Sequence, residues 1–247
     1  MPKWFRSLFT KKETDLSPEL LGRLEKLERI VGFDIDDPSL FLKALRHRST
    51  LSQDKYETYD SYERLEFLGD AVLDLIAAEI LFNDYPEKDE GFLTKVRAKL
   101  VRGDTLSTLS TRLGLDDLME LGERNGNNGI SKSILADAFE SIIAAIYITK
   151  GYQDAYDFVH SVIQDHLELS KLINTTDNYK SALLELAQSR KQPIPYYELV
   201  KETGPGHNKT FEVKVMIGDK ELGTGKGKSK KKAEQRAAKQ ALDAFEA

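Results

Sequence analysis

The hydrophobic periodicity of this chain changes once, near residue 178, and that change limits the folds available to it. Between residues 18 and 173, apolar residues recur at intervals of three and four, which predicts a series of α-helices. Further on, the segments 196–201 and 211–217 alternate apolar and polar residues, which predicts β-strands. The pattern predicts an all-α domain followed by a small α+β domain.

The α+β part has a complete order of elements. A helix over 179–189, the two strands, a third short strand over 220–224 and a closing helix over 229–245 give α-β-β-β-α, with the helices expected on one face of an antiparallel sheet. The segment 169–178 is polar and predicts a connection. The expected divisions are an N-terminal extension (1–19), the helical domain (20–170), a linker (171–177) and the α+β domain (178–247).

Charge divides the chain at the same place. Residues 178–247 hold 14 Lys and Arg against 9 Asp and Glu, a net charge of +5, whereas residues 1–177 hold 22 against 32, a net charge of -10. This division favours polyanion binding by the tail and cation binding by the body. The chain contains no cysteine, so its chemistry must come from oxygen and nitrogen groups.

Membrane insertion is not expected. No apolar run approaches the roughly 20 residues that cross a bilayer, and the segment 1–12 lacks the apolar core of a secretory signal. We therefore expect a soluble, cytoplasmic protein with no membrane span.

Four carboxylates lie at intervals of three, four and four in an otherwise apolar helical segment. At about 100° per residue they fall within an arc of about 80°. Such like-charge pairs repel by roughly 0.2–0.5 kcal/mol each in an isolated helix, so the stripe is explained either by solvation or by a divalent cation. The four are Glu63, Glu66, Asp70 and Asp74.

A second pair of acids lies in a more apolar helix. Asp137 and Glu140 are the only charged residues between 134 and 147, and their spacing of three puts them on one side. Burying two carboxylates without partners costs several kcal/mol. If this side meets Glu66 and Asp70, four carboxylates converge, and oxygen-only ligands select magnesium or manganese.

Each pair alone has a simpler explanation. Glu66 and Asp70 could lie on a solvated stripe, and the downstream pair could bind arginines such as Arg64 or Arg97. The two pairs together, joined to a basic tail, favour a metal site instead. An oxygen-ligated magnesium polarises a phosphoryl oxygen and activates water, which suits phosphodiester hydrolysis.

Two motifs of the tail could contact phosphates. The turn 204–211 contains His207, and the lysine run 228–232 opens the last helix, where ammonium groups and a helix N-terminus can meet phosphates together. Taken singly, the lysine run is equally well explained as a solvated helix start, and His207 is better explained as an ordinary turn histidine. Their combination on the α-β-β-β-α pattern is specific.

These motifs resemble a known family. Residues 178–246 resemble the double-stranded RNA-binding domain, and residues 20–170 resemble the ribonuclease III endonuclease domain, whose signature is similar to the segment 63–74. The whole chain resembles a bacterial ribonuclease III. Further matching segments are Ala44-Leu45-Arg46-His47-Arg48-Ser49, residues 93–101 and residues 132–140.

The resemblance implies a homodimeric, magnesium-dependent endoribonuclease, with manganese able to substitute, in which each protomer cuts one strand of an RNA duplex. Products would have 5′-phosphate and 3′-hydroxyl ends with a short 3′ overhang, and substrates would include ribosomal RNA precursors and other structured transcripts rather than small molecules. By the same resemblance the metal cluster is Glu66, Asp70, Asp137 and Glu140, of which Asp70 and Glu140 are catalytic.

The resemblance also implies contact residues. Glu63 matches an acid that helps to bind RNA or the partner subunit, and Phe67 matches an apolar knob at the dimer contact. The tail residues at RNA-facing positions are Ser181, Glu185, Gln188, His207, Lys228, Lys230 and Lys231.

Two other functions remain open at this point. The first is a protein that binds duplex RNA without cutting it, which the presence of all four carboxylates disfavours. The second is an all-α nucleoside triphosphate pyrophosphatase, for which Glu63/Glu66 and Asp137/Glu140 would suffice, although it leaves the basic tail unexplained.

Overall fold

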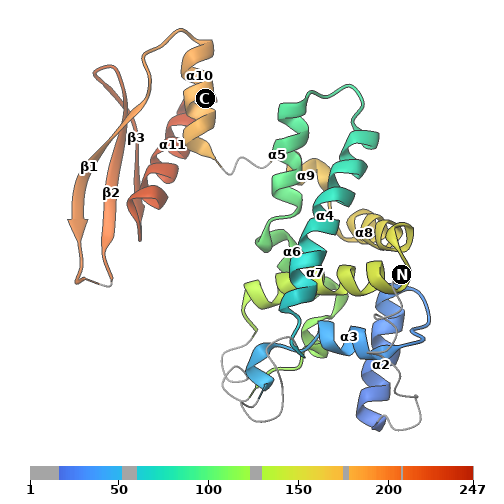
Figure 1. Cartoon of the computed structure of the whole chain (residues 1–247). Helices are drawn as coiled ribbons and strands as arrows, with labels where there is room; N and C mark the ends of the chain where they lie inside the picture. The colour runs from blue at the N-terminus through green and yellow to red at the C-terminus, as the bar shows by residue number, and fades with distance from the viewer. Residues whose placement is uncertain (1–16, 52–59, 123–129, 175–177, 207, 247) are drawn as a thin grey trace. The chain divides into compact units, whose positions relative to one another are not determined.

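The computed structural model describes residues 17–51, 60–122, 130–174, 178–206 and 208–246, and its contacts divide the chain into two compact units (Figure 1). We call Met1–Ile173 the N-terminal unit and Asn174–Ala247 the C-terminal unit. The N-terminal unit contains α2 (Pro18–Val31), α3 (Pro38–Ala44), η2 (Arg48–Thr50), α4 (Glu63–Asp84), α5 (Glu90–Leu100), α6 (Gly103–Leu113), η4 (Asp116–Leu118), α7 (Lys132–Thr149), α8 (Tyr152–His166) and α9 (Leu169–Asn174). The C-terminal unit contains α10 (Tyr179–Ser189), β1 (Tyr196–Thr203), β2 (Thr210–Ile217), β3 (Lys220–Gly227) and α11 (Lys230–Glu246). The predicted fold class is confirmed.

The N-terminal unit is organised around the crossing of α4 and α7 (Figure 1). Gly69 of α4 lies directly against α7, because a Cβ added there would come within 1.8 Å of the carbonyl oxygen of Glu140. No side chain could fit at this point, so the two backbones are in contact. This contact puts the acidic side of α4 beside Asp137 and Glu140.

Local sequence explains where α7 begins and why it is buried. The hydroxyl of Ser131 accepts a hydrogen bond from the backbone amide of Ile134, an N-cap that ends the preceding loop. Continuous burial of apolar residues from Ile142 to Ile146 follows. α7 therefore forms the centre of the core, as its scarcity of charge predicts.

The C-terminal unit packs a helix unusually close to its sheet. The strand order is β1-β2-β3, all antiparallel, and a Cβ at Gly223, Gly225 or Gly227 would come within 2.2–2.7 Å of the backbone of α11. The facing residues of α11 are alanines, among them Ala233 and Ala237, both fully buried. Small residues on both sides thus fix the helix against β3.

Three boundaries differ from the sequence predictions. β3 continues to Gly227 rather than ending at 224, and β1 continues to Thr203 rather than ending at 201. Part of the segment expected as the linker is helical: α9 extends to Asn174, and Lys99 donates hydrogen bonds to the carbonyls of Leu172 and Ile173. Of the expected extension 1–19, residues 1–16 lie outside the described residues. Among the described helices, none has both the length and the apolar character needed to span a membrane.

Candidate active site

Three carboxylates meet at the crossing of α4 and α7. Glu66 comes from α4, and Asp137 and Glu140 come from α7; one oxygen from each lies within 4.8 Å of the other two. All three residues are partly buried, and none forms an ion pair with a Lys or Arg of the described residues. We call this group the carboxylate cluster. The arginine pairing considered from the sequence is not observed: Arg97 lies 4.0 Å from Asp74 instead.

Burial and mutual repulsion disfavour ionisation of the cluster. Burial, followed by the charges of Asp70 and Asp137, raises the pKa of Glu140 to about 8. Burial is also the main cause of the raised pKa values of Glu66 and Asp137. A hard divalent cation would remove this penalty, and an all-oxygen donor set of this charge fits magnesium or manganese.

Asp70 lies beside the carboxylate cluster rather than within it. It is one helical turn beyond Glu66, it is exposed, and it does not belong to the group of oxygens within 4.8 Å. Its charge still raises the pKa of Glu140 and of Glu66, so it is close enough to interact with both. The structure therefore brings together three of the four predicted ligands tightly and the fourth at the margin.

A cavity of about 460 Å³ opens next to the carboxylate cluster. Glu63 lies at its edge and forms an ion pair with Arg48, with Oε1 and Nη1 3.3 Å apart. The wall includes Tyr62, whose hydroxyl donates a hydrogen bond to Oδ2 of Asp137 at 3.1 Å. Tyr62 was not among the residues predicted from the sequence, because the prediction followed the spacing of carboxylates and a tyrosine does not belong to that pattern. The residues lining the cavity are His47, Arg48, Tyr62, Glu63, Glu66, Ser133, Ile134 and Asp137.

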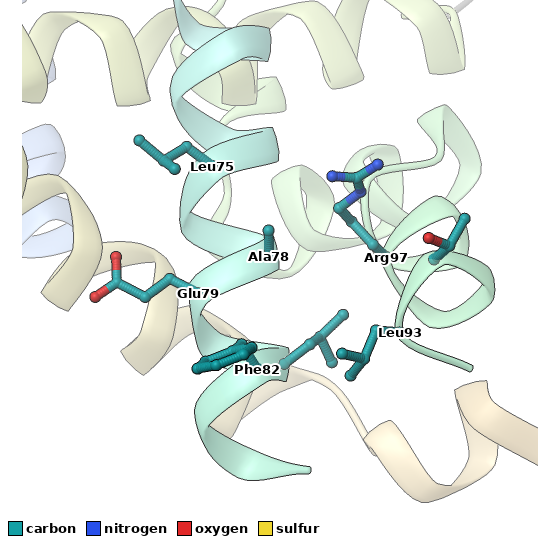
Figure 2. Close-up of a pocket in the computed structure, with 8 residues that line it drawn as sticks. Leu75, Ala78, Glu79, Phe82, Leu93 and Arg97 are labelled. Atoms are coloured by element: carbon teal, nitrogen blue, oxygen red, sulfur yellow. The ribbon is translucent and has the colours of Figure 1, made fainter. Parts of the chain in front are cut away.

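An apolar stripe runs along the exposed side of α4. Phe67, Leu75 and Phe82 are 82%, 58% and 69% exposed and fall within an arc of about 80°. Beside the last two lies a groove of about 420 Å³ between α4 and α5, to which Leu93 and Arg97 of α5 also contribute (Figure 2). So much exposed apolar surface on one helix is typical of a protein–protein contact. We call Phe67, Leu75 and Phe82 the α4 stripe.

The C-terminal unit presents two of the predicted RNA-facing segments on its surface. Ser181, Glu185 and Gln188 are exposed and share one side of α10, and Lys230 and Lys231 are exposed at the start of α11.

A hydrogen bond links the loop before α11 to the turn between β1 and β2. It runs from Nζ of Lys228 to Oδ1 of Asn208 over 2.6 Å. In that turn Gly204 has φ of +100°, and a Cβ there would lie 2.4 Å from the carbonyl oxygen of Asn208. His207 lies outside the described residues.

A helical unit with an acidic cluster suited to a hard cation, joined to an α-β-β-β-α unit with exposed lysines, defines a class: a nuclease domain followed by a double-stranded RNA-binding domain. Family models agree with this class. Residues 37–167 match a model described as Ribonuclease-III-like, and residues 179–244 match the double-stranded RNA binding motif.

Similar proteins and structures narrow the class to a family. The chain is 41% identical over 224 residues to Ribonuclease 3 of Carboxydothermus hydrogenoformans, covering 89% of this chain and 94% of that one, and 40% identical over 222 residues to Ribonuclease 3 of Sulfurovum sp., covering 89% and 97%. A solved nuclease domain of ribonuclease III from Campylobacter jejuni matches with a TM-score of 0.53 and 37% identity, covering 58% of this chain and 97% of that one. The chain belongs to the ribonuclease III family of endoribonucleases, so the resemblance noted in the sequence is confirmed.

Proposed function

We propose that this protein hydrolyses phosphodiester bonds of double-stranded RNA in a magnesium-dependent reaction, with manganese able to substitute. The observation that carries the proposal is the carboxylate cluster: three acids within 4.8 Å, partly buried, with no cationic partner among the described residues. Such a group costs free energy unless it binds a cation.

The acids of the site would have different roles. Glu66, Asp137 and Glu140 would hold the metal, and Asp70, at the exposed margin, would complete the set when substrate and metal are present. Magnesium bound there would supply Lewis-acid polarisation of the phosphoryl oxygen and activation of water. Asp70 and Glu140 are the acids that we propose as catalytic, and the products would carry 5′-phosphate and 3′-hydroxyl ends with a short 3′ overhang.

RNA binding would fall mainly to the C-terminal unit. Its exposed lysines can neutralise phosphates, and the exposed side of α10 can contact ribose hydroxyls in the shallow minor groove, so recognition would follow duplex shape. The proposed contacts are Ser181, Glu185, Gln188, His207, Lys228, Lys230 and Lys231, with Glu63 contributing at the cut site. Ribosomal RNA precursors and other structured transcripts in the cytoplasm are the expected substrates.

A homodimer would bring two carboxylate clusters to one duplex. The α4 stripe supports this, and the similar Campylobacter jejuni structure is described as having a region involved in dimer formation. Phe67→Asp should convert dimers to monomers in analytical ultracentrifugation. Ile194→Asp, which changes an exposed apolar residue of the C-terminal unit, is the matched control. A monomeric wild-type protein, or a Phe67→Asp variant that remains dimeric, would contradict this assignment.

The function itself is tested with long duplex RNA, incubated with and without magnesium. We expect cleavage only with the metal, and end-labelling should give 5′-phosphate termini. Duplex binding without cleavage at any magnesium or manganese concentration would instead support a non-cleaving RNA-binding protein.

A further inference from the structure

The aromatic residue that precedes α4 is fixed from several directions. The side chain of Tyr62 is buried, with 3% of the residue exposed, and its backbone amide donates a hydrogen bond to the carbonyl of Arg46 at 3.1 Å. Its own carbonyl accepts hydrogen bonds from the amides of Leu65 and Glu66 at the start of the helix. The ring lies 5.8 Å from the ring of His47. Little freedom remains for the ring to move.

The one polar atom of this side chain is directed at the carboxylate cluster. The Tyr62 hydroxyl donates to Oδ2 of Asp137 at 3.1 Å, across 75 residues of sequence. Burial raises the pKa of Tyr62 above its ordinary value, and Asp137 raises it further, so the hydroxyl keeps its proton and acts as the donor.

A hydrogen bond of this kind has two effects on a ligand. It fixes the rotation of the Asp137 carboxylate, and it partly offsets the negative charge that Glu66 and Glu140 bring close. Partners that hold a metal ligand in this way typically change metal affinity by about 10- to 100-fold when they are removed.

We propose that Tyr62 is a positioning residue whose hydroxyl orients Asp137, so that Glu66, Asp137 and Glu140 bind a divalent cation together. The inference rests on the proposed metal site and adds to it a residue outside the four carboxylates. Tyr62 itself does not contact the cation or the RNA phosphate.

The test compares Tyr62→Phe with the wild-type full-length protein. The substitution keeps the ring and removes only the hydroxyl. Binding of Mn²⁺ alone, measured by electron paramagnetic resonance, should weaken about tenfold. The Mn²⁺ concentration for half-maximal cleavage should rise by the same factor, while the rate at saturating Mn²⁺ stays within about twofold of wild type.

A second tyrosine provides the matched control. Tyr152 of α8 donates its hydroxyl to Glu79, away from the carboxylate cluster. Tyr152→Phe should leave Mn²⁺ binding unchanged. If both variants weaken binding equally, a general effect of losing a tyrosine hydroxyl explains the result and the proposal is wrong.

A double-mutant cycle separates positioning from a merely structural role. In an Asp137→Asn background, Tyr62→Phe should cause no further loss of Mn²⁺ affinity, because the residue that it orients no longer binds as a carboxylate. An equal further loss would show that Tyr62 acts by another route and would overturn the inference. Unchanged affinity of Tyr62→Phe in the wild-type background would also overturn it while leaving the metal site intact. If the wild type bound no Mn²⁺, the proposal of a metal site would itself be wrong.

Discussion

The two units differ in whether their charged side chains have partners of opposite charge. In the N-terminal unit, the carboxylate cluster holds like charges within 4.8 Å without a cationic partner among the described residues. In the C-terminal unit, two lysines of the sheet are paired with acids of the neighbouring strand: Lys214 with Glu198 at 2.9 Å and Lys226 with Glu212 at 3.3 Å. Paired charges stabilise the sheet modestly, and their charges cancel. The acids of the carboxylate cluster have no such partner among the described residues, so they need a cation from outside the chain.

Within the C-terminal unit, the exposed lysines also differ in whether they are paired with an acid. Lys230 and Lys231 at the start of α11 form no ion pair with a described residue, unlike Lys214 and Lys226 of the sheet. Unpaired charges of like sign therefore lie close together at the crossing of α4 and α7, where they are acidic, and at the start of α11, where they are basic. These are the places where a metal and an RNA backbone are proposed to bind.

The largest expected effect comes from removing one unpaired acid. Glu140→Gln should reduce duplex RNA cleavage by at least about 10³-fold, because a lost metal ligand removes several kcal/mol of transition-state stabilisation. Duplex binding, measured by fluorescence anisotropy in EDTA, should stay within about twofold. Asp74→Asn is the control, since Asp74 lies on α4 but contacts Arg97. Comparable losses in both variants would show that acidity of α4 and α7 in general, rather than the carboxylate cluster, supports cleavage.

The second effect concerns the close backbone contact between α4 and α7 in the N-terminal unit. Gly69→Ala should lower the free energy of unfolding of the N-terminal unit by about 3 kcal/mol, because the new methyl group would meet the backbone of Glu140 and not a movable side chain. Urea unfolding followed by circular dichroism measures this change.

Another helical glycine gives the opposite expectation. Gly22, in α2, has no atom within 4 Å of an added Cβ, so Gly22→Ala should stabilise by about 0.5–1 kcal/mol. If Gly69→Ala is as well tolerated, α4 and α7 can separate at their crossing and the contact does not fix the site.

Periodicity predicted the arrangement of the site better than its details. The spacing of acids in two apolar helices favoured a site where Glu66 meets Asp137 and Glu140, because buried carboxylates without a partner cost free energy, and the family resemblance implied the same residues. The spacing could not predict that Asp70 would lie at the margin, because that depends on where along α4 the crossing with α7 falls. Gly69 determines this point, and a glycine in a helix gives no sign of what it contacts.

The strands show in the same way that local sequence predicts elements better than it predicts the contacts between them. β2 alternates apolar and polar residues and was predicted within one residue, whereas β3 was predicted three residues too short. Its end carries Gly225 and Gly227, which disfavour strands by local propensity. Their place in β3 comes from the close approach of α11, a tertiary effect absent from the local sequence.

The third effect tests the unpaired lysines. Replacing Lys230 and Lys231 together by alanine should weaken duplex RNA binding about tenfold and reduce the slope of log affinity against log salt by up to about 2, because each lysine that neutralises a phosphate releases counterions. Electrophoretic mobility shifts at several salt concentrations measure both quantities.

The paired lysines provide the control for this experiment. Lys214 and Lys226 carry the same charge but bind Glu198 and Glu212. Their double alanine variant should keep most of the affinity. If it loses as much affinity and slope as the α11 variant, RNA binding follows net charge alone and the start of α11 has no special role.

The smallest effect is a dependence of stability on pH that differs in sign between the units. In the N-terminal unit the pKa of Glu140 is raised to about 8, so the folded form keeps a proton that the unfolded form releases near its ordinary value of 4.5. Stability should therefore fall as pH rises from about 4.5 to 8, by about 1 kcal/mol after allowance for solvent screening. In the C-terminal unit, the hydrogen bond from Lys209 lowers the pKa of Glu202, so the stability from that contact is retained over this range and lost only at more acidic pH. Urea unfolding in EDTA at pH 5 and pH 8 should show the decline in the N-terminal unit, Glu140→Gln should flatten it, and Mn²⁺ added at pH 8 should reverse it. A decline that Glu140→Gln leaves unchanged would place the titrating group elsewhere, because no proton could then be exchanged at position 140.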